Sequence, residues 1–322
     1  MAESLQSLKT RLKGVKNIGQ ITKAMELVAA TKMRRSQEIA LASRPYTLTA
    51  LDLLATVTRL EETSDKKVSL PALLTSRDIK TTAIVVVTSD KGLAGAFNSS
   101  VLRAFEAYLR DKQIDLTDPK YVFIAVGQKS AAYLEKRTGN LAAKFVRVGD
   151  YTSLDQVRPI SADIIEGYLS GKWDEVIVFS AHFKSALRQE VTTRRIFPVD
   201  AASLSQTAKE IVPEHGRFAE LVRSERASFF NRNPEILREY IIEPDAAAIL
   251  EALARHLVEA ELYQLILEAN ASEHAARRMA MKSASDNATE LAENLNLSYN
   301  KSRQAAITRE LIEITAGAES LS

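Results

Sequence analysis

The sequence predicts an α/β domain with a mostly parallel sheet, held between two long terminal helices that pair as an antiparallel coiled coil. The first observation is that residues 245 to 316 contain no glycine or proline and repeat leucine and isoleucine at helical steps. The second is that short apolar runs alternate with helical stretches in the centre of the chain. The third is a helical stripe over the first 60 residues.

The helix predicted over residues 245 to 316 is too long for an ordinary domain. Pro244 fits its start and Gly317 its end. At about 1.5 Å per residue it would measure roughly 108 Å. It therefore needs a partner helix over part of its length and another covering over the rest. Its apolar positions include Leu250, Leu253, Leu257, Ala288, Leu291, Leu295, Ile307, Leu311 and Ile314.

The first helix is predicted from residue 4 to about residue 60, with a kink or break at Pro45. Its apolar stripe is Leu5, Leu8, Leu12, Val15, Ile18, Ile21, Met25 and Val28, and it resumes from Leu48 to Leu60. The added three-residue step from Val15 to Ile18 is typical of a stammer. Gly14 and Gly19 each weaken the helix by about 1 kcal/mol. The two glycines fit either close helix contact or a bend.

The centre of the chain predicts a Rossmann-like, mostly parallel sheet. Its strands are expected at 83–88, 121–126, 145–148 and 175–180, and its helices at 101–112, 129–137 and 155–169. Strands that are apolar on both faces and alternate with helices form βαβ units. Residues 191–198 predict an added antiparallel strand after a turn at 184–187.

Residues 203–236 are charged and broken by prolines, so they predict an inserted excursion, and 238–242 predicts one more strand. The expected organisation is a coiled-coil helix over 1–60, an α/β domain over 61–243 and a second coiled-coil helix over 244–322. Both helices leave the domain on one side, which makes the pair antiparallel.

Composition excludes several classes of chemistry. The chain has no cysteine, so disulfides and thiolate metal sites are ruled out. The four histidines have no ligand spacing, no nucleophile-elbow motif is present, and we expect no metal, no cofactor and no catalytic residue. No apolar run reaches the roughly 18 residues that span a bilayer, and the start lacks a signal-peptide core.

Two other function classes compete at this point. The net charge is only +2, but residues 1–40 hold eight basic and three acidic residues, which fits an adaptor or a nucleic-acid-binding helix. The loop at residues 89–98 follows the first strand, where open α/β sheets bind ligands, yet it has no phosphate-binding glycine motif. Asn287, Asn294, Asn296 and Asn300 crowd the last helix and favour contact with another molecule over register setting.

Three stretches carry a specific likeness: RLKGVKNIGQITKAMELVAATKMRRSQ, TSDKGLAGAFN and SEHAARRMAMKSASDNATELAENLNLSYNKSRQAAITRELIEITAGAESL. They resemble, in this order along the chain, the gamma subunits of F-type ATP synthases. The resemblance implies a rotor shaft, present in one copy, that turns inside a ring of alpha and beta subunits. It further implies contacts with the epsilon subunit and the membrane c-ring.

The resemblance also implies what the subunit does. The shaft would couple ion flow, taken to be of protons, through the c-ring to ATP synthesis or hydrolysis, and would hold no catalytic residue of its own. No nucleic acid partner is expected. Its partners would hold it as a peripheral membrane protein on the cytoplasmic side of a bacterial membrane.

The same likeness implies contact residues. Met25, with Lys23 and Arg35 near it, would face loops of the catalytic subunits. Arg303, Gln304 and Thr308 match the RQAxIT positions that form a hydrogen-bonding catch. The apolar tail with Leu311, Ile312 and Ile314 would sit in the upper bearing.

The sequence departs from the family pattern at three places. Ala94 stands where relatives often have cysteine, so nothing depends on a thiol there. The insertion at 203–236 has no cysteine, which argues against thiol regulation. Gly19 replaces a better helix former.

Overall fold

The computed structural model describes residues 4–43, 46, 50, 71–198, 243 and 245–319, without the side chains of 246 and 317–319. The predictions for Pro45, for the stripe residues Leu48, Leu51, Leu54, Val57 and Leu60, for 203–236 and 238–242, and for Pro244 lie outside these residues. The chain divides into two compact units, one of residues 1–30 with 277–322 and one of residues 31–276. Each unit is described by itself. The predicted domain limits at 60–61 and 243–244 fall on or beside residues outside the described set.

The described elements alternate between helix and strand through the centre of the chain, as predicted. In order they are α1 (Leu5–Ala42), η1 (Ala72–Leu74), β1 (Thr82–Val87), α3 (Phe97–Asp111), β2 (Tyr121–Val126), α4 (Gln128–Leu134), β3 (Leu141–Phe145), α5 (Leu154–Leu169), β4 (Glu175–Phe183), β5 (Gln189–Phe197) and α8 (Ala246–Glu319).

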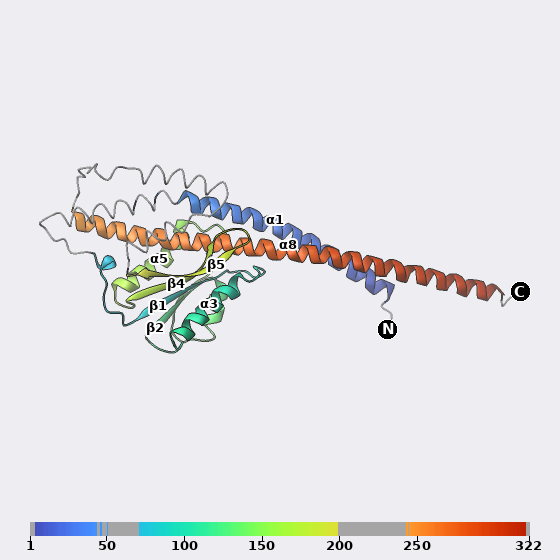
Figure 1. The fold of residues 1–322 in the computed structure, drawn as a ribbon, viewed down its shortest axis with the longest axis horizontal. Helices are drawn as coiled ribbons and strands as arrows, with labels where there is room; N and C mark the ends of the chain where they lie inside the picture. Colours follow the sequence, from blue (N-terminus) through green and yellow to red (C-terminus); the bar gives the residue numbers. More distant parts are fainter. Residues whose placement is uncertain are drawn as a thin grey trace. The chain divides into compact units, whose positions relative to one another are not determined.

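The five strands form one sheet in the order β3-β2-β1-β4-β5 (Figure 1). β1 pairs in parallel with β2 and β4, β2 pairs in parallel with β3, and β5 is antiparallel to β4. This confirms the mostly parallel sheet and its added antiparallel strand. β1 is buried along its whole length, which explains why its sequence TAIVVV is apolar on both faces.

Helices cover both faces of the sheet. On one face, the ring of Phe179 in β4 packs edge-on against Phe105 in α3, with centroids 5.7 Å apart. On the other face, Nδ1 of His182 lies 2.6 Å from Oε2 of Glu268 in α8. Since residues 179 and 182 point to opposite sides of one strand, α3 and the 246–276 part of α8 pack on opposite faces.

Several predicted boundaries were wrong. α3 begins at Phe97 and not at 101, α4 ends at Leu134 and not at 137, and β4 continues to Phe183 and not only to 180. The third strand runs over Leu141–Phe145 and not over 145–148, because Arg147 and Gly149 both have positive φ angles that end the extended path. Its sequence LAAKF, with two alanines and a lysine, gave little strand signal, as suits a strand at the edge of the sheet. At the other end of the chain, α8 continues through Gly317 to Glu319. A helical glycine costs only about 1 kcal/mol, which does not by itself end a helix.

In the unit of residues 1–30 with 277–322, α1 and α8 run antiparallel. A Cβ on Gly19 would lie 3.4 Å from Cβ of Ala288, whereas the charges nearest Glu26 on α8 are those of Arg278 and Lys282. Partner numbers therefore fall on α8 as they rise on α1. Gly19 thus marks close helix contact, which was one of the two roles predicted for it, the other being a bend. The antiparallel coiled coil is as predicted.

The predicted stammer is wrong. The inward positions of α1 follow an unbroken heptad with alternating steps of four and three, while Ile18, Ile21 and Val28 are exposed. The inward positions in this unit are Leu8, Leu12, Val15, Gly19, Thr22, Glu26 and Ala29. The sequence pattern failed because the inward residues from Gly19 onward are small or polar, so the apolar row beside them was mistaken for the seam. Leu291 of α8 is likewise exposed.

Asp174, just before β4, ties the segment leading into β1 to the sheet. Its carboxylate accepts hydrogen bonds from the backbone amides of Lys80 and Thr81 and lies 2.7 Å from Nε of Arg77. Burial by itself raises the pKa of Asp174, but these hydrogen bonds and the Arg77 charge outweigh it. The pKa therefore lies below its ordinary value of 3.8.

We expect Asp174→Asn to remove stability that depends on pH. A carboxyl whose pKa falls on folding stabilises the protein above its unfolded pKa, and this stability is lost as the pH falls through the folded pKa. Urea unfolding at pH 7 should show a less stable variant, with the difference from the unsubstituted chain shrinking below about pH 4. Asp111→Asn, on the last residue of α3, serves as the control. A constant difference at all pH values would contradict the assignment.

Candidate partner interface on the two long helices

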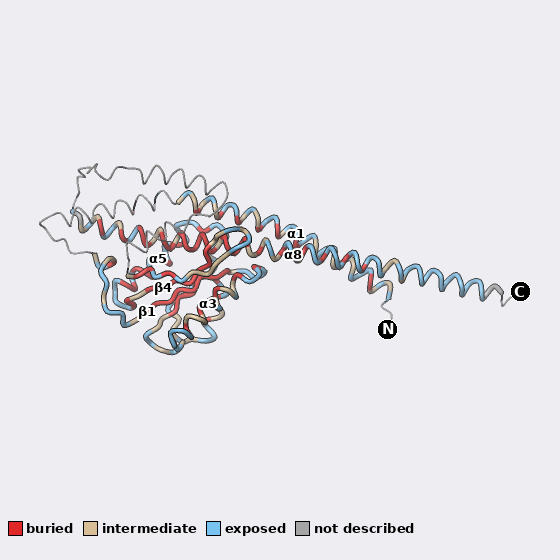
Figure 2. Tube along the Cα trace, viewed as in Figure 1, coloured by how far each residue is buried: buried red, intermediate tan, exposed pale blue. Residues whose placement is uncertain are grey.

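The distal part of α8 has no covering among the described residues. Every residue from 303 to 316 is exposed (Figure 2). Large apolar side chains lie on this stretch, among them Leu311 at 58% and Ile314 at 62% exposure, with Ile307 and Ile312 beside them. Contiguous apolar exposure of this kind marks a protein contact surface. The prediction that this helix needs a covering other than α1 agrees with the exposure.

Arg303, Gln304 and Thr308 lie on the same exposed stretch. The hydroxyl of Thr308 donates to the carbonyl oxygen of Gln304 at 2.9 Å, so the two residues occupy successive turns of one face. Within the described residues, Arg303 forms no ion pair. An exposed guanidinium, amide and hydroxyl on neighbouring positions of one helix can bind the backbone or the acidic side chains of another protein. Their role as a catch stays a prediction.

The three predicted contact residues on α1 do not form one cluster. Lys23 and Met25 belong to the unit of residues 1–30 with 277–322, and Arg35 belongs to the other unit. Lys23 pairs with Glu26 at 2.9 Å and Arg35 with Glu38 at 3.3 Å, each three residues along the helix. The Arg35–Glu38 pair is exposed and contributes little, and the side chain of Lys23 is 58% exposed although its partner Glu26 is buried, so both cations remain able to contact a partner.

Met25 borders a second apolar row on α1, formed by Ile18, Ile21 and Val28, which lies outside the seam. Ile18, Ile21 and Val28 are 56%, 59% and 54% exposed, and Met25 is half-buried between this row and the seam. The paired surfaces, in contrast, are lined by residues such as Gly19, Thr22, Ser285 and Ala288. This part of the coiled coil is therefore small and polar inside and apolar outside, the reverse of the usual pattern. The unbroken heptad through Gly19 was the signal that could have revealed it.

Glu26 is the charged member of the seam. The hydrogen bond from Lys23, and the charges of Lys23, Arg278 and Lys282, hold the pKa of Glu26 below its ordinary value despite some burial. A polar group at one seam position fixes the register of paired helices, because any shift would leave it without its partners. Glu26 therefore favours this one alignment of α1 on α8.

One of the three basic residues in the run 32–35 is held by another part of the chain. Lys32 binds Asp150 at 2.5 Å, whereas Arg35 makes only an exposed pair with Glu38 on its own helix. Nucleic-acid binding needs several cations free to neutralise phosphates. Because Lys32 is held in this way, the arrangement favours a protein partner over the nucleic-acid reading.

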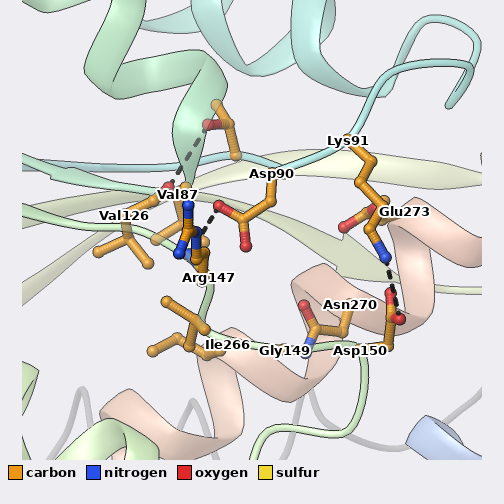
Figure 3. Close-up of a pocket in the computed structure, with 13 residues that line it drawn as sticks. Val87, Asp90, Lys91, Val126, Arg147, Gly149, Asp150, Ile266, Asn270 and Glu273 are labelled. Carbon is orange, nitrogen blue, oxygen red and sulfur yellow. Dashed lines mark hydrogen bonds and ion pairs between the residues drawn. The ribbon is translucent and has the colours of Figure 1, made fainter.

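The loop after β1 lines a pocket of about 190 Å³ together with residues of β2, the β3–α5 loop and α8 (Figure 3). The backbone amides of Gln128 and Arg147 are the groups that could bind an anion here. Both already donate to Oδ1 of Asp90. This self-capping gives no support to phosphate binding there. The loop acts as a strand-to-helix turn.

Metal binding and membrane spanning have no structural support in the described part of the chain. It contains no group of three or more His, Cys, Asp or Glu side chains placed to hold a metal ion. No helix among the described residues is both long and apolar enough to cross a bilayer. His182 and His274 are both buried, and His182 is hydrogen-bonded to Glu268.

The sequence of this chain matches a known protein family over almost its whole length. A family model described as ATP synthase matches residues 4–321. The ATP synthase gamma chain of Roseiflexus castenholzii is 38% identical over 323 residues, which cover 99% of this chain and 98% of that one. That of Geobacter sp. strain M21 is 36% identical over 318 residues, covering 99% of each chain.

Solved structures support the same fold. A chain of the Euglena gracilis mitochondrial ATP synthase, in a structure titled OSCP/F1/c-ring in rotational state 3, aligns with a TM-score of 0.59 at 19% identity. The alignment covers 98% of this chain and 94% of that chain. On the sequence matches and the matching fold, the chain belongs to the ATP synthase gamma chain family.

Proposed function

We propose that this chain is the central rotor shaft of an F-type ATP synthase, which couples ion flow through a membrane c-ring to ATP synthesis or hydrolysis. The observation that carries the proposal is the exposed stretch of residues 303–316, on a chain whose family is that of gamma chains. A helix that leaves its apolar residues exposed needs a collar of other proteins. In this role the subunit is not an enzyme and contributes no catalytic residue.

The partners follow from this role. The distal helix and the second apolar row of α1 face the ring of alpha and beta subunits, and the α/β domain binds the epsilon subunit and the c-ring. The titles of the related Euglena structures name a rotor and a c-ring. One copy per complex suits an asymmetric shaft. The subunit is held by these partners as a peripheral protein on the cytoplasmic side of a bacterial membrane.

The asymmetric shape of the shaft is what produces coupling. A shaft with Arg303 and Gln304 on one face presents a different surface to each of the catalytic sites around it. As it turns, each site meets that surface in succession, and its affinity for nucleotide changes with the contact. The free energy of rotation is thereby converted into a sequence of affinity changes.

Affinity purification of the tagged chain from its native host tests the proposal. We expect alpha and beta subunits to co-purify, in amounts that exceed one copy each per shaft, and ATP to be hydrolysed by the complex. Recovery of nucleic acid with no alpha or beta subunits would favour the adaptor reading instead. Stabilisation of the isolated chain by nucleotide would favour the reading as a nucleotide-dependent enzyme.

A further inference from the structure

Asp150 connects three other elements of the unit formed by residues 31–276. It lies in the loop between β3 and α5, and its Oδ2 is 2.5 Å from Nζ of Lys32 in α1. The same oxygen is 3.5 Å from Nζ of Lys91, in the loop after β1 (Figure 3). Nε2 of His274 in α8 lies 4.0 Å from its Oδ1. One carboxylate thus meets both long helices and a second loop.

On each long helix, the contact with Asp150 lies close to the residue at which this unit ends. Lys32 is the second residue of α1 inside this unit, which begins at Thr31, and His274 is the third from its end at Ala276. Both contacts therefore lie within one turn of the point where each helix passes into the other unit. A load carried along either helix enters the α/β domain at this level.

The two helices are anchored in this unit by different means. α8 contributes a row of fully buried side chains to the hydrophobic core, among them Leu250, Leu257 and Leu265. No residue of α1, which is described throughout Leu5–Ala42, belongs to that core. α1 buries only a narrow face in this unit, with Met33, Ser36 and Ala40. Polar contacts add to it: the Lys32–Asp150 pair, and the bond from the hydroxyl of Ser43, just past its end, to Gln264 at 2.8 Å.

The loop that presents Asp150 is itself fixed. Nδ2 of Asn270 in α8 donates to Oγ1 of the buried Thr152 at 2.7 Å, and Asp90 accepts from the amide of Arg147. Gly149, with a φ of 89°, turns the backbone just before Asp150. Burial raises the pKa of Asp150, but the hydrogen bond from Lys32 and the charges of Lys32, Lys91 and His274 outweigh it and keep the carboxylate ionised.

We propose that Asp150 is a positioning residue that clamps α1 to the α/β domain, so that torque passes between the domain and both helices together. The inference rests on the proposed rotor function for its mechanical consequence, whereas the clamp itself is a property of the isolated chain. Without the clamp, α8 stays anchored by its core and α1 alone becomes loose. The loss of coupling is then larger when the shaft works against an ion gradient than when it rotates without one.

Hydrogen exchange of the isolated chain tests the clamp. Asp150→Asn should speed amide exchange in residues 31–42 of α1 by about tenfold, and leave residues 250–266 of α8 unchanged. Asp150→Glu, which keeps the charge, should recover part of the protection. Asp155→Asn is the matched control, because its carboxylate is 82% exposed and pairs only with Arg158 among the described residues. Equal protection in Asp150→Asn and Asp155→Asn would overturn the clamp.

The assembled complex tests the mechanical consequence. With Asp150→Asn, ATP hydrolysis without an ion gradient should stay within about twofold of the original rate. The ions pumped per ATP against a gradient in sealed vesicles should fall at least about twofold, and Asp150→Glu should recover part of the loss. An unchanged pumping ratio would overturn the coupling role. Failure of the unsubstituted chain to assemble with alpha and beta subunits would instead count against the rotor function, while hydrogen exchange still decides the clamp.

Discussion

A complex whose shaft carries Arg303→Ala together with Gln304→Ala is expected to assemble normally but to turn over ATP about tenfold more slowly. Both side chains lie on the fully exposed part of α8, so their removal leaves the fold of the isolated chain unchanged. In the proposed role, their hydrogen bonds form with a catalytic subunit at one rotational position. A loss of about 1.4 kcal/mol of binding at that position corresponds to the tenfold change.

The control for this variant is Arg309→Ala with Glu313→Ala. These residues are equally exposed and lie on the same stretch, but they point to the other side of the helix from Gln304 and Thr308. Steady-state hydrolysis by purified complexes, at matched subunit content, is the measurement. If both double variants lose turnover equally, the effect belongs to the stretch as a whole. Unchanged turnover in the first variant would exclude the catch.

Gly127→Ala is expected to destabilise the α/β domain by about 4 kcal/mol or more, which is enough to unfold many domains. Gly127 precedes α4 with φ 98° and ψ 150°, a region that essentially only glycine occupies. A Cβ there would lie 2.1 Å from the backbone oxygen of Thr88. Since that oxygen belongs to the segment leaving β1, the clash can be relieved only by moving the strand end.

Gly171→Ala separates the two causes. Gly171 also has a positive φ, at 74°, but a Cβ there would meet nothing within 4 Å. This variant should therefore lose only the backbone term of about 1–2 kcal/mol. Chemical unfolding followed by the fluorescence of the buried Trp173 measures both. Equal losses in the two variants would show that the contact with Thr88 contributes nothing.

The sheet was predictable because its strands carry strong local signals. β1, β2 and β4 are apolar on both faces, so the sequence alone placed them to within one residue at their starts and gave their parallel pairing. β3 was misplaced because its two alanines and one lysine carry little strand propensity, and none of its residues is fully buried. The strands that are largely buried were predicted correctly, whereas the partly exposed edge strand was not.

The contact surface was predictable only in part. The distal residues Arg303 to Ile314 were identified through family likeness, and the length of the helix independently required a covering. The seam of α1 was misread, because Gly19, Thr22 and Glu26 are not the residues that a coiled-coil pattern seeks. The contacts of Asp150 were missed altogether. They join residues 32, 91, 150 and 274, and no local pattern in the sequence links positions so far apart.

The small residues between α1 and α8 have a mechanical consequence. Gly19 against Ala288 lets the helix axes approach to near the lower end of the usual range of roughly 8–10 Å. The resistance of a two-stranded rod to bending and twisting rises steeply with the separation of its strands. A closely spaced pair therefore bends and twists more easily than a widely spaced one, so in the proposed role this part of the shaft can twist elastically under load.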